Sequence, residues 1–173
     1  PIAAAGASLH IATHAVGKIT LFFCAGAIMV ASHKKNISDM VGLGRQMPLT
    51  MAAFAIGAIS IIGLPPMAGT WSKWYLTIGA LEADKLLIVA VLMISSLLNI
   101  AYLLPIPIKA FFNSQAQKQA PWSWSQTKEA PLPCLIAIGV TSFGCLLMFF
   151  YPQPLIDLIN LIPGISTNLN GEG

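Results

Sequence analysis

Three ionisable residues, His10, His14 and Lys18, follow one another at intervals of four near the start of the chain. In an α-helix this spacing puts all three on one face, with roughly 6 Å along the axis between successive positions. Histidine changes its protonation state near neutral pH, so it both accepts and releases protons there. The spacing therefore predicts a ladder of groups along which a proton can pass.

Lys18 lies near the centre of a long apolar run. A charged side chain there costs at least about 2.5 to 3.5 kcal/mol on insertion scales. A carboxylate partner, a water-filled cavity or loss of the ammonium proton would offset that cost, and the last two are what a proton relay needs. The apolar runs contain no Asp or Glu, so a carboxylate partner would have to come from elsewhere. Thr13 and Thr20, in the same run, are expected to hold bridging water.

A further lysine, Lys73, follows Ser72 in a mostly apolar segment that starts at Gly69. We predict that Lys73 lies deep in the membrane and joins the same proton path, with Ser72 as a supporting hydroxyl. The neighbouring Trp71 and Trp74 allow another interpretation, because tryptophans gather at membrane interfaces, where a lysine reaches to water.

Other interpretations of these residues stay open. Either histidine alone would fit a hydrogen-bonded structural role. In a redox membrane protein, His10 and His14 would bind a haem or a metal, although two histidines one turn apart cannot bind opposite faces of one porphyrin. The remaining histidine, His33, falls at a helix end. A purely structural membrane module predicts instead that Lys18→Leu is silent.

The composition indicates that these residues are placed by helices in lipid. Hydrophobic residues make up 56% of the 173 residues and charged residues only 9%, whereas a soluble domain typically has about 25% charged residues. The length suits four or five crossings of about 20 residues and leaves no room for a second, soluble domain. No basic stripe with interleaved aromatics occurs, which argues against nucleic acid as a partner. The three cysteines lack the paired spacing of a metal site and are expected to be small buried hydrophobes.

The apolar runs predict an all-α membrane protein with four transmembrane helices. These helices are expected at about 3–32, 48–81, 86–108 and 132–151. A short amphipathic stretch, Leu155 to Leu161, is expected at the membrane surface. The chain is thus expected to consist of a transmembrane domain over 1–154, followed by an interfacial segment and tail over 155–173.

The second of these helices is predicted to be discontinuous. Gly63, Pro65 and Pro66 interrupt its helical ladder. The positive loops 33–47 and 109–131 are both expected in the cytoplasm, which requires an even number of crossings between them. Counting 48–81 as one broken helix gives two crossings and puts the interruption near mid-membrane. Broken helices persist where protein buries them or where they line a wet cavity, so the break is a functional candidate; a plain proline kink is the alternative.

Four groups of residues resemble a known family, the antiporter-type subunits of Mrp cation/proton antiporters and respiratory complex I. They run from residue 10 to residue 154, nearly the whole chain. The groups are His10-x-x-x-His14-Ala15-x-x-Lys18-x-x-Leu21-Phe22; Gly42-Leu43-Gly44 with Met47-Pro48; Gly63-Leu64-Pro65-Pro66-x-x-Gly69-x-x-Ser72-Lys73; and Phe150-Tyr151-Pro152-Gln153-Pro154.

The resemblance implies a fourteen-helix protein built from inverted repeats, of which this chain would be the C-terminal part. The start at Pro1, with no signal peptide before the apolar run, agrees with such a fragment. His10, His14 and Lys18 match the second half of the family's file of protonatable residues, and Lys73 matches the charged residue of its second broken helix.

The full histidine ladder with Lys73 looks most like the D-type subunits of Mrp antiporters; a subunit of complex I or of a membrane hydrogenase is the alternative. The resemblance implies other membrane subunits as partners, protons and Na⁺ as transported ions, and the bacterial inner (plasma) membrane as the location. It implies no cofactor, metal or covalent catalysis in this chain, so redox activity would belong to partner subunits.

Overall fold

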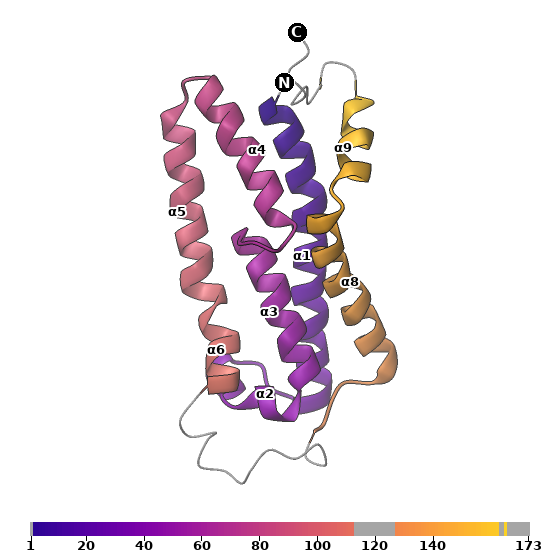
Figure 1. Ribbon diagram of the computed structural model, residues 1–173. Helices are drawn as coiled ribbons and strands as arrows, with labels where there is room; N and C mark the ends of the chain where they lie inside the picture. The colour runs from indigo at the N-terminus through magenta and orange to yellow at the C-terminus, as the bar shows by residue number, and fades with distance from the viewer. Residues whose placement is uncertain (1, 113–126, 163–164, 166–173) are drawn as a thin grey trace.

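The computed structural model describes residues 2–112, 127–162 and 165, and within these residues the chain is helical with no strand (Figure 1). The all-helical expectation is therefore confirmed. The longer helices are α1 (Ile2–Ser32), α3 (Pro48–Ile62), α4 (Gly69–Glu82), α5 (Leu86–Leu103), α6 (Pro105–Phe112), α8 (Leu132–Phe150) and α9 (Gln153–Asn160). A 3₁₀ turn, η1 (Ile37–Met40), and the short α2 (Leu43–Gln46) lie within the first polar loop.

Three helical stretches in the described part of the chain are long and apolar enough to cross a membrane: α1, α8 and the combined α5 and α6, Leu86–Phe112. The last of these extends beyond the predicted end at residue 108. Ala110 is fully buried, and the Phe111 ring lies so close to Gly44 that a Cβ added there would be 2.6 Å from it. Packing against α2 therefore continues the helix past the charged Lys109.

Helices α3 and α4 lie one after the other along α1 (Figure 1). Gly17, at the midpoint of α1, faces Ile61 of α3, while Gly6, in the first half, faces Tyr75 of α4. A Cβ added at Gly6 would lie 2.7 Å from the backbone nitrogen of Leu76, so glycine is what permits this close approach. Two short helices together thus cover the length of one long helix.

The first polar loop and the described ends of the second lie at the same end of the bundle, where α2 and α6 are found (Figure 1). The Gly42 backbone N–H donates to the Lys109 carbonyl at 3.3 Å, and the Lys128 N–H donates to the Gln46 carbonyl at 2.8 Å. The described ends of the second loop therefore lie against the first loop. Loops 33–47 and 109–131 were expected on one side, and this contact agrees with that expectation, although 113–126 fall outside the described residues.

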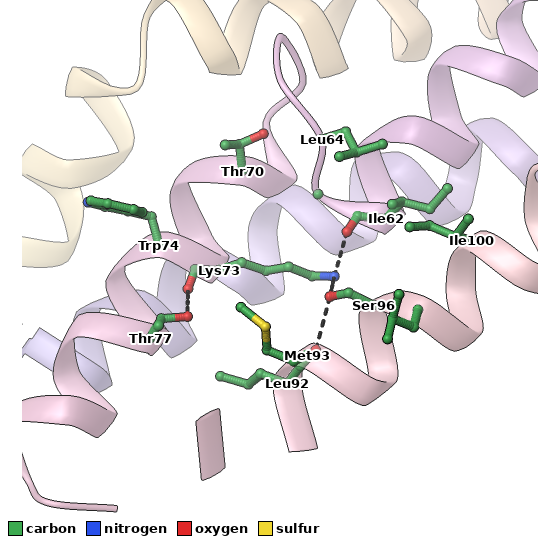
Figure 2. Close-up of a pocket in the computed structure, with 12 residues that line it drawn as sticks. Ile62, Leu64, Thr70, Lys73, Trp74, Thr77, Leu92, Met93, Ser96 and Ile100 are labelled. Atoms are coloured by element: carbon green, nitrogen blue, oxygen red, sulfur yellow. Dashed lines mark hydrogen bonds between the residues drawn. The ribbon is translucent and has the colours of Figure 1, made fainter. Parts of the chain in front are cut away.

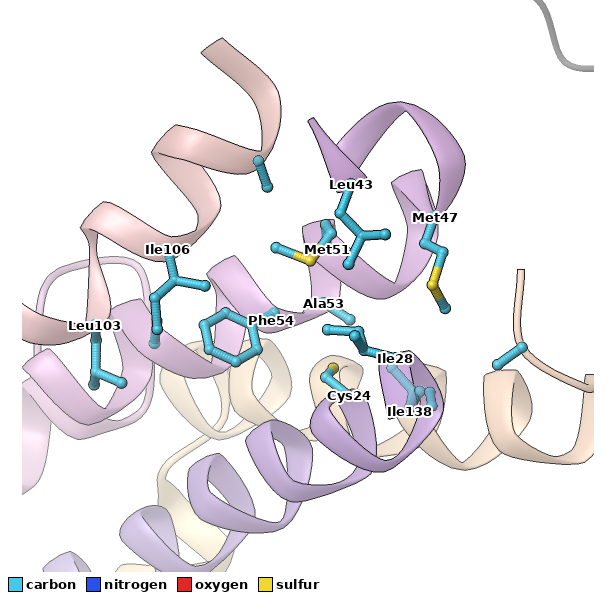
Figure 3. Close-up of a cluster of buried hydrophobic side chains, with 14 of the residues drawn as sticks. Cys24, Ile28, Leu43, Met47, Met51, Ala53, Phe54, Leu103, Ile106 and Ile138 are labelled. Carbon is cyan, nitrogen blue, oxygen red and sulfur yellow. The ribbon is translucent and has the colours of Figure 1, made fainter. Parts of the chain in front are cut away.

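An apolar cluster at this end fixes the packing of α1, α3, α6 and α8 (Figure 3). Its buried members include Cys24 and Ile28 of α1, Phe54 of α3 and Ile138 of α8. In contrast, α5 presents many large apolar side chains outward. Since lipid is as apolar as a protein core, an outward apolar face is stable in a membrane.

The structure corrects the expectation about one cysteine and shows where the amphipathic stretch lies. Cys24 and Cys145 are buried as predicted, but Cys134, in the first turn of α8, is exposed. The amphipathic stretch forms α9, and its Ile159 is buried in a small cluster that includes Leu9 of α1. Leu155 and Ile156 of α9 pack against the same cluster, so α9 contacts the start of the bundle through several apolar side chains.

Candidate functional site

The break between α3 and α4, residues 63–68, begins with a left-handed glycine. Gly63 has φ +84° and its N–H donates to the Ile59 carbonyl at 2.9 Å, a common way for a helix to end. A Cβ at Gly63 would lie 2.6 Å from Cδ of Lys73. Glycine is therefore needed both for the turn and to let the Lys73 side chain pass, and Pro65 and Pro66 keep the helix from resuming at once.

The break is packed against the neighbouring helices. Gly69, the first residue of α4, lies so close to the last turn of α3 that an added Cβ would collide with the Ser60 carbonyl. The Ala68 backbone N–H donates to the Cys145 carbonyl of α8 at 3.1 Å. Protein thus supplies backbone partners that lipid could not offer.

Lys73 points into the break (Figure 2). Its Nζ donates to the Ile62 carbonyl at 2.6 Å and to Ser96 Oγ at 2.7 Å. Ile62 is the last residue of α3, so its carbonyl has no partner one turn further on and lies at the negative end of the helix dipole. The Lys73 ammonium therefore caps the carboxyl end of α3.

A pocket of about 410 Å³ adjoins the Lys73 amine between α3, α4 and α5 (Figure 2). Its walls are mostly apolar, with Leu64, Leu92 and Leu97 among them, and the hydroxyl-bearing residues of its lining are Thr70, Thr77 and Ser96. Trp74, which offered the interface interpretation, is exposed on the same side. The Lys73 side chain, in contrast, extends to the carboxyl end of α3.

Next to Lys73 in sequence, Ser72 links α4 to the histidine ladder. His10 Nδ1 lies 3.0 Å from Ser72 Oγ, and Thr13 Oγ1 lies 3.3 Å from the same oxygen. Ser72 is fully buried and donates to the Gly69 carbonyl at 3.1 Å. Because this bond uses the single hydroxyl hydrogen of Ser72, the His10 tautomer that fits carries its proton on Nδ1.

The predicted ladder lies along one side of α1. The rings of His10 and His14 are stacked, with centroids 5.2 Å apart. His14 and Lys18 line a second pocket of about 420 Å³, to which Asn99 and Tyr102 of α5 contribute. Lys18 is exposed in this structure, whereas both histidines are partly buried.

Thr20 does not lie on the side of α1 that carries His14 and Lys18. Its hydroxyl donates to the Val16 carbonyl at 2.9 Å and lies 3.9 Å from the Cys145 sulfur of α8. Two residues along a helix correspond to a rotation of about 200°, so Thr20 faces away from Lys18. Thr20 therefore lies away from the ladder, whereas Thr13 lies at Ser72. The bridging water that both were expected to hold stays a prediction.

Two residues near the ends of α3 were not singled out from the sequence. Ser96 receives a hydrogen bond from Lys73, and Glu129 binds the first turn of α3 through the Leu49 N–H at 2.6 Å and the Thr50 hydroxyl at 2.7 Å. A hydroxyl within an apolar run was a usable signal for Ser96. Glu129 gave no local capping signature, because it comes from a distant part of the chain.

Among the described residues, no group of three or more His, Cys, Asp or Glu side chains is placed to hold a metal ion. The haem or metal interpretation of His10 and His14 stays a prediction, and the structure adds that His10 Nδ1 is engaged by Ser72.

Long apolar helices, a packed helix break and a lysine inside it define a multi-pass helical membrane protein. Residues 2–99 match the family model described as NADH:quinone oxidoreductase/Mrp antiporter, transmembrane. The chain belongs to this family, which confirms the resemblance seen in its motifs.

Relatives within the family come from both branches. The N-type subunit of the NADH-quinone oxidoreductase of Desulforudis audaxviator is 38% identical over 159 residues, which cover 88% of this chain and 32% of that protein. The D-type subunit of the Na(+)/H(+) antiporter of Alkalihalophilus pseudofirmus is 30% identical over 160 residues, which cover 91% of this chain and 32% of that protein. The chain thus spans about a third of the length of these curated relatives.

A solved structure shares the fold. It is a chain from the membrane-bound sulfane sulfur reductase, described as an archaeal respiratory membrane complex, with a TM-score of 0.78 and 27% identity. The match covers 94% of this chain and 26% of that chain.

Proposed function

We propose that this chain is the proton-translocating C-terminal part of an antiporter-like membrane subunit. Its four spans would be α1, α3 with α4, α5 with α6, and α8. Helices α3 and α4 are each shorter than the about 20 residues that a crossing needs. Their end-to-end course along α1 and the contact between the two polar loops support one discontinuous crossing.

The observation that carries the proposal is the bonding of Lys73. The two hydrogen bonds of its amine go to a carbonyl and a hydroxyl, and neither acceptor carries a formal charge. A carboxylate would hold the lysine in its charged form, whereas neutral acceptors leave it able to exchange its proton. Protons would pass along Lys18, His14 and His10 and then reach Lys73. The hydrogen bond between His10 and Ser72, the residue before Lys73, joins the ladder to α4.

The test uses the full-length subunit in its native assembly, in inverted membrane vesicles. Lys73→Ala and Lys18→Ala are each expected to abolish most proton transport while the complex still assembles. Lys85→Ala is the matched control, because Lys85 is exposed in the connection between α4 and α5. Normal transport in both the Lys73 and Lys18 variants would refute the relay.

The assembly that holds the subunit is a separate question. The motifs favour an Mrp-type cation/proton antiporter, with Na⁺ as a candidate ion and other membrane subunits as partners. The 38% identity to the oxidoreductase subunit, against 30% to the antiporter subunit, favours a respiratory complex as the second candidate. Transport driven by a Na⁺ gradient without electron donor supports the first; transport that requires electron transfer to quinone supports the second.

The same proposal places the protein in the bacterial plasma membrane with loops 33–47 and 109–131 in the cytoplasm. Cysteines introduced at the exposed Lys35 and Lys128 positions test this orientation. Both are expected to react with a membrane-impermeant thiol reagent in inverted vesicles and not in intact cells, and the opposite pattern would contradict it.

A further inference from the structure

Ser96 of α5 is bonded on both sides. Its Oγ accepts a hydrogen bond from Lys73 Nζ at 2.7 Å and donates to the Leu92 carbonyl of its own helix at 3.0 Å. The second bond directs the hydroxyl hydrogen of Ser96 to the Leu92 carbonyl (Figure 2). A lone pair of the Ser96 oxygen is then left to accept from the lysine. Ser96 is thus aimed at the amine by its own helix.

We propose that Ser96 is a positioning residue that holds the Lys73 amine at the end of α3 while the lysine gains and loses its proton. This inference rests on the proposed function of Lys73. It adds α5, through a neutral hydroxyl, to the machinery that the sequence placed only on α1 and on the broken helix.

A hydroxyl suits this position because it can serve both protonation states. A lysine ammonium has three hydrogens to donate and no lone pair, so Ser96 accepts from it. The neutral amine has two hydrogens and one lone pair, and Ser96 can then turn its own hydrogen from Leu92 to Nζ. The contact between α4 and α5 therefore persists when the proton leaves, whereas a carboxylate would favour the charged state alone.

The surroundings of Ser96 indicate that no neighbour on α5 can replace it. The residues of α5 that line the Lys73 pocket beside it are apolar, namely Leu92, Met93, Leu97 and Ile100. The adjacent Ser95 is exposed and does not line this pocket. The chain thus offers two consecutive serines on one helix, of which one binds Lys73 and the other provides a matched control.

The experiment measures initial rates of proton transport against pH in inverted vesicles that contain the full-length subunit in its native assembly. Ser96→Ala is expected to slow transport about tenfold, as loss of a hydrogen bond to a charged group would suggest. The high-pH limb of its profile should move to lower pH, because the protonated amine loses an acceptor. Ser96→Thr should restore the rate and the profile, and Ser95→Ala should match the wild type.

The outcomes distinguish this inference from the proposed function. If Lys73→Ala is inactive but Ser96→Ala transports as Ser95→Ala does, the role of Ser96 is overturned and that of Lys73 stands. If Lys73→Ala transports normally, Lys73 carries no proton and the role of Ser96 falls with it; if Lys18→Ala also transports normally, the proposed function itself fails. Should Ser96→Ala not assemble, Ser96→Cys keeps the size with a weaker hydrogen bond. A normal rate and pH profile in that variant would also overturn the role of Ser96.

Discussion

Replacing Lys73 by arginine or by methionine separates its cap on α3 from the proton exchange that we propose for it. Arginine keeps a positive charge under all physiological conditions and cannot act as a proton carrier. Methionine keeps most of the length of the side chain but has neither charge nor donor. The pocket of about 410 Å³ beside the amine gives room for the larger guanidinium group.

The magnitudes follow from the two bonds of the amine. A hydrogen bond from a charged group contributes about 1.5 to 3 kcal/mol, so Lys73→Met loses about 3 to 6 kcal/mol from the bonds to Ile62 and Ser96. Removing the buried charge regains about 2.5 to 3.5 kcal/mol. With the middle of each range, the methionine variant should therefore be less stable by about 1.5 kcal/mol. The arginine variant, which keeps the charge and at least one bond, should stay within about 1 kcal/mol of the wild type.

Two measurements check this pair of variants in the purified full-length protein and in vesicles. Titration with SDS in mixed micelles gives the change in unfolding free energy, and proton uptake by inverted vesicles gives the transport rate. We expect a stable but inactive arginine variant and a destabilised, inactive methionine variant. Transport at the normal rate with arginine would refute proton exchange at Lys73, and unchanged stability with methionine would refute the cap. Lys85→Met controls for loss of an exposed charge.

Two further predictions concern the ends of α3. Glu129→Ala should destabilise the protein by about 1 to 2 kcal/mol, because the first turn of α3 loses its cap; the same SDS titration checks this, and a change no larger than in exposed Glu82→Ala would contradict it. Gly69→Ala should cost at least about 1 to 3 kcal/mol, because its Cβ would meet the Ser60 carbonyl. Gly139→Ala, where nothing lies within 4 Å of an added Cβ, should be nearly neutral, and equal effects of the two would disprove the close packing at the break.

Several predictions needed only the properties of single residues and of their neighbours in sequence. The apolar composition was enough for an all-helical membrane protein, because in lipid a backbone must satisfy its own hydrogen bonds. The four-residue spacing was enough to bring His10 beside His14, since helical geometry alone determines that contact. Gly63 and Pro65 marked the end of α3 through their own backbone preferences.

Faces of the helices were harder to predict. In a soluble helix the polar side identifies the outer face, but here both the inner and the outer face of a helix are apolar. The direction in which Thr20 faces and the exposure of Cys134 were therefore not predictable from the apolar pattern. The outward apolar side chains of α5 carry no pattern that tells which residue faces the break.

The sequence by itself determined which residues can exchange protons and where the helix must stop, because these properties belong to single residues and to their nearest neighbours. Only the tertiary structure decided what those residues bind. The Lys73 amine finds the end of α3 and Ser96 of another helix, and Glu129 reaches the opposite end of α3. These partners depend on the relative heights at which helices pack, and helix packing is determined by close contacts such as those at Gly6 and Gly17 rather than by any local periodicity.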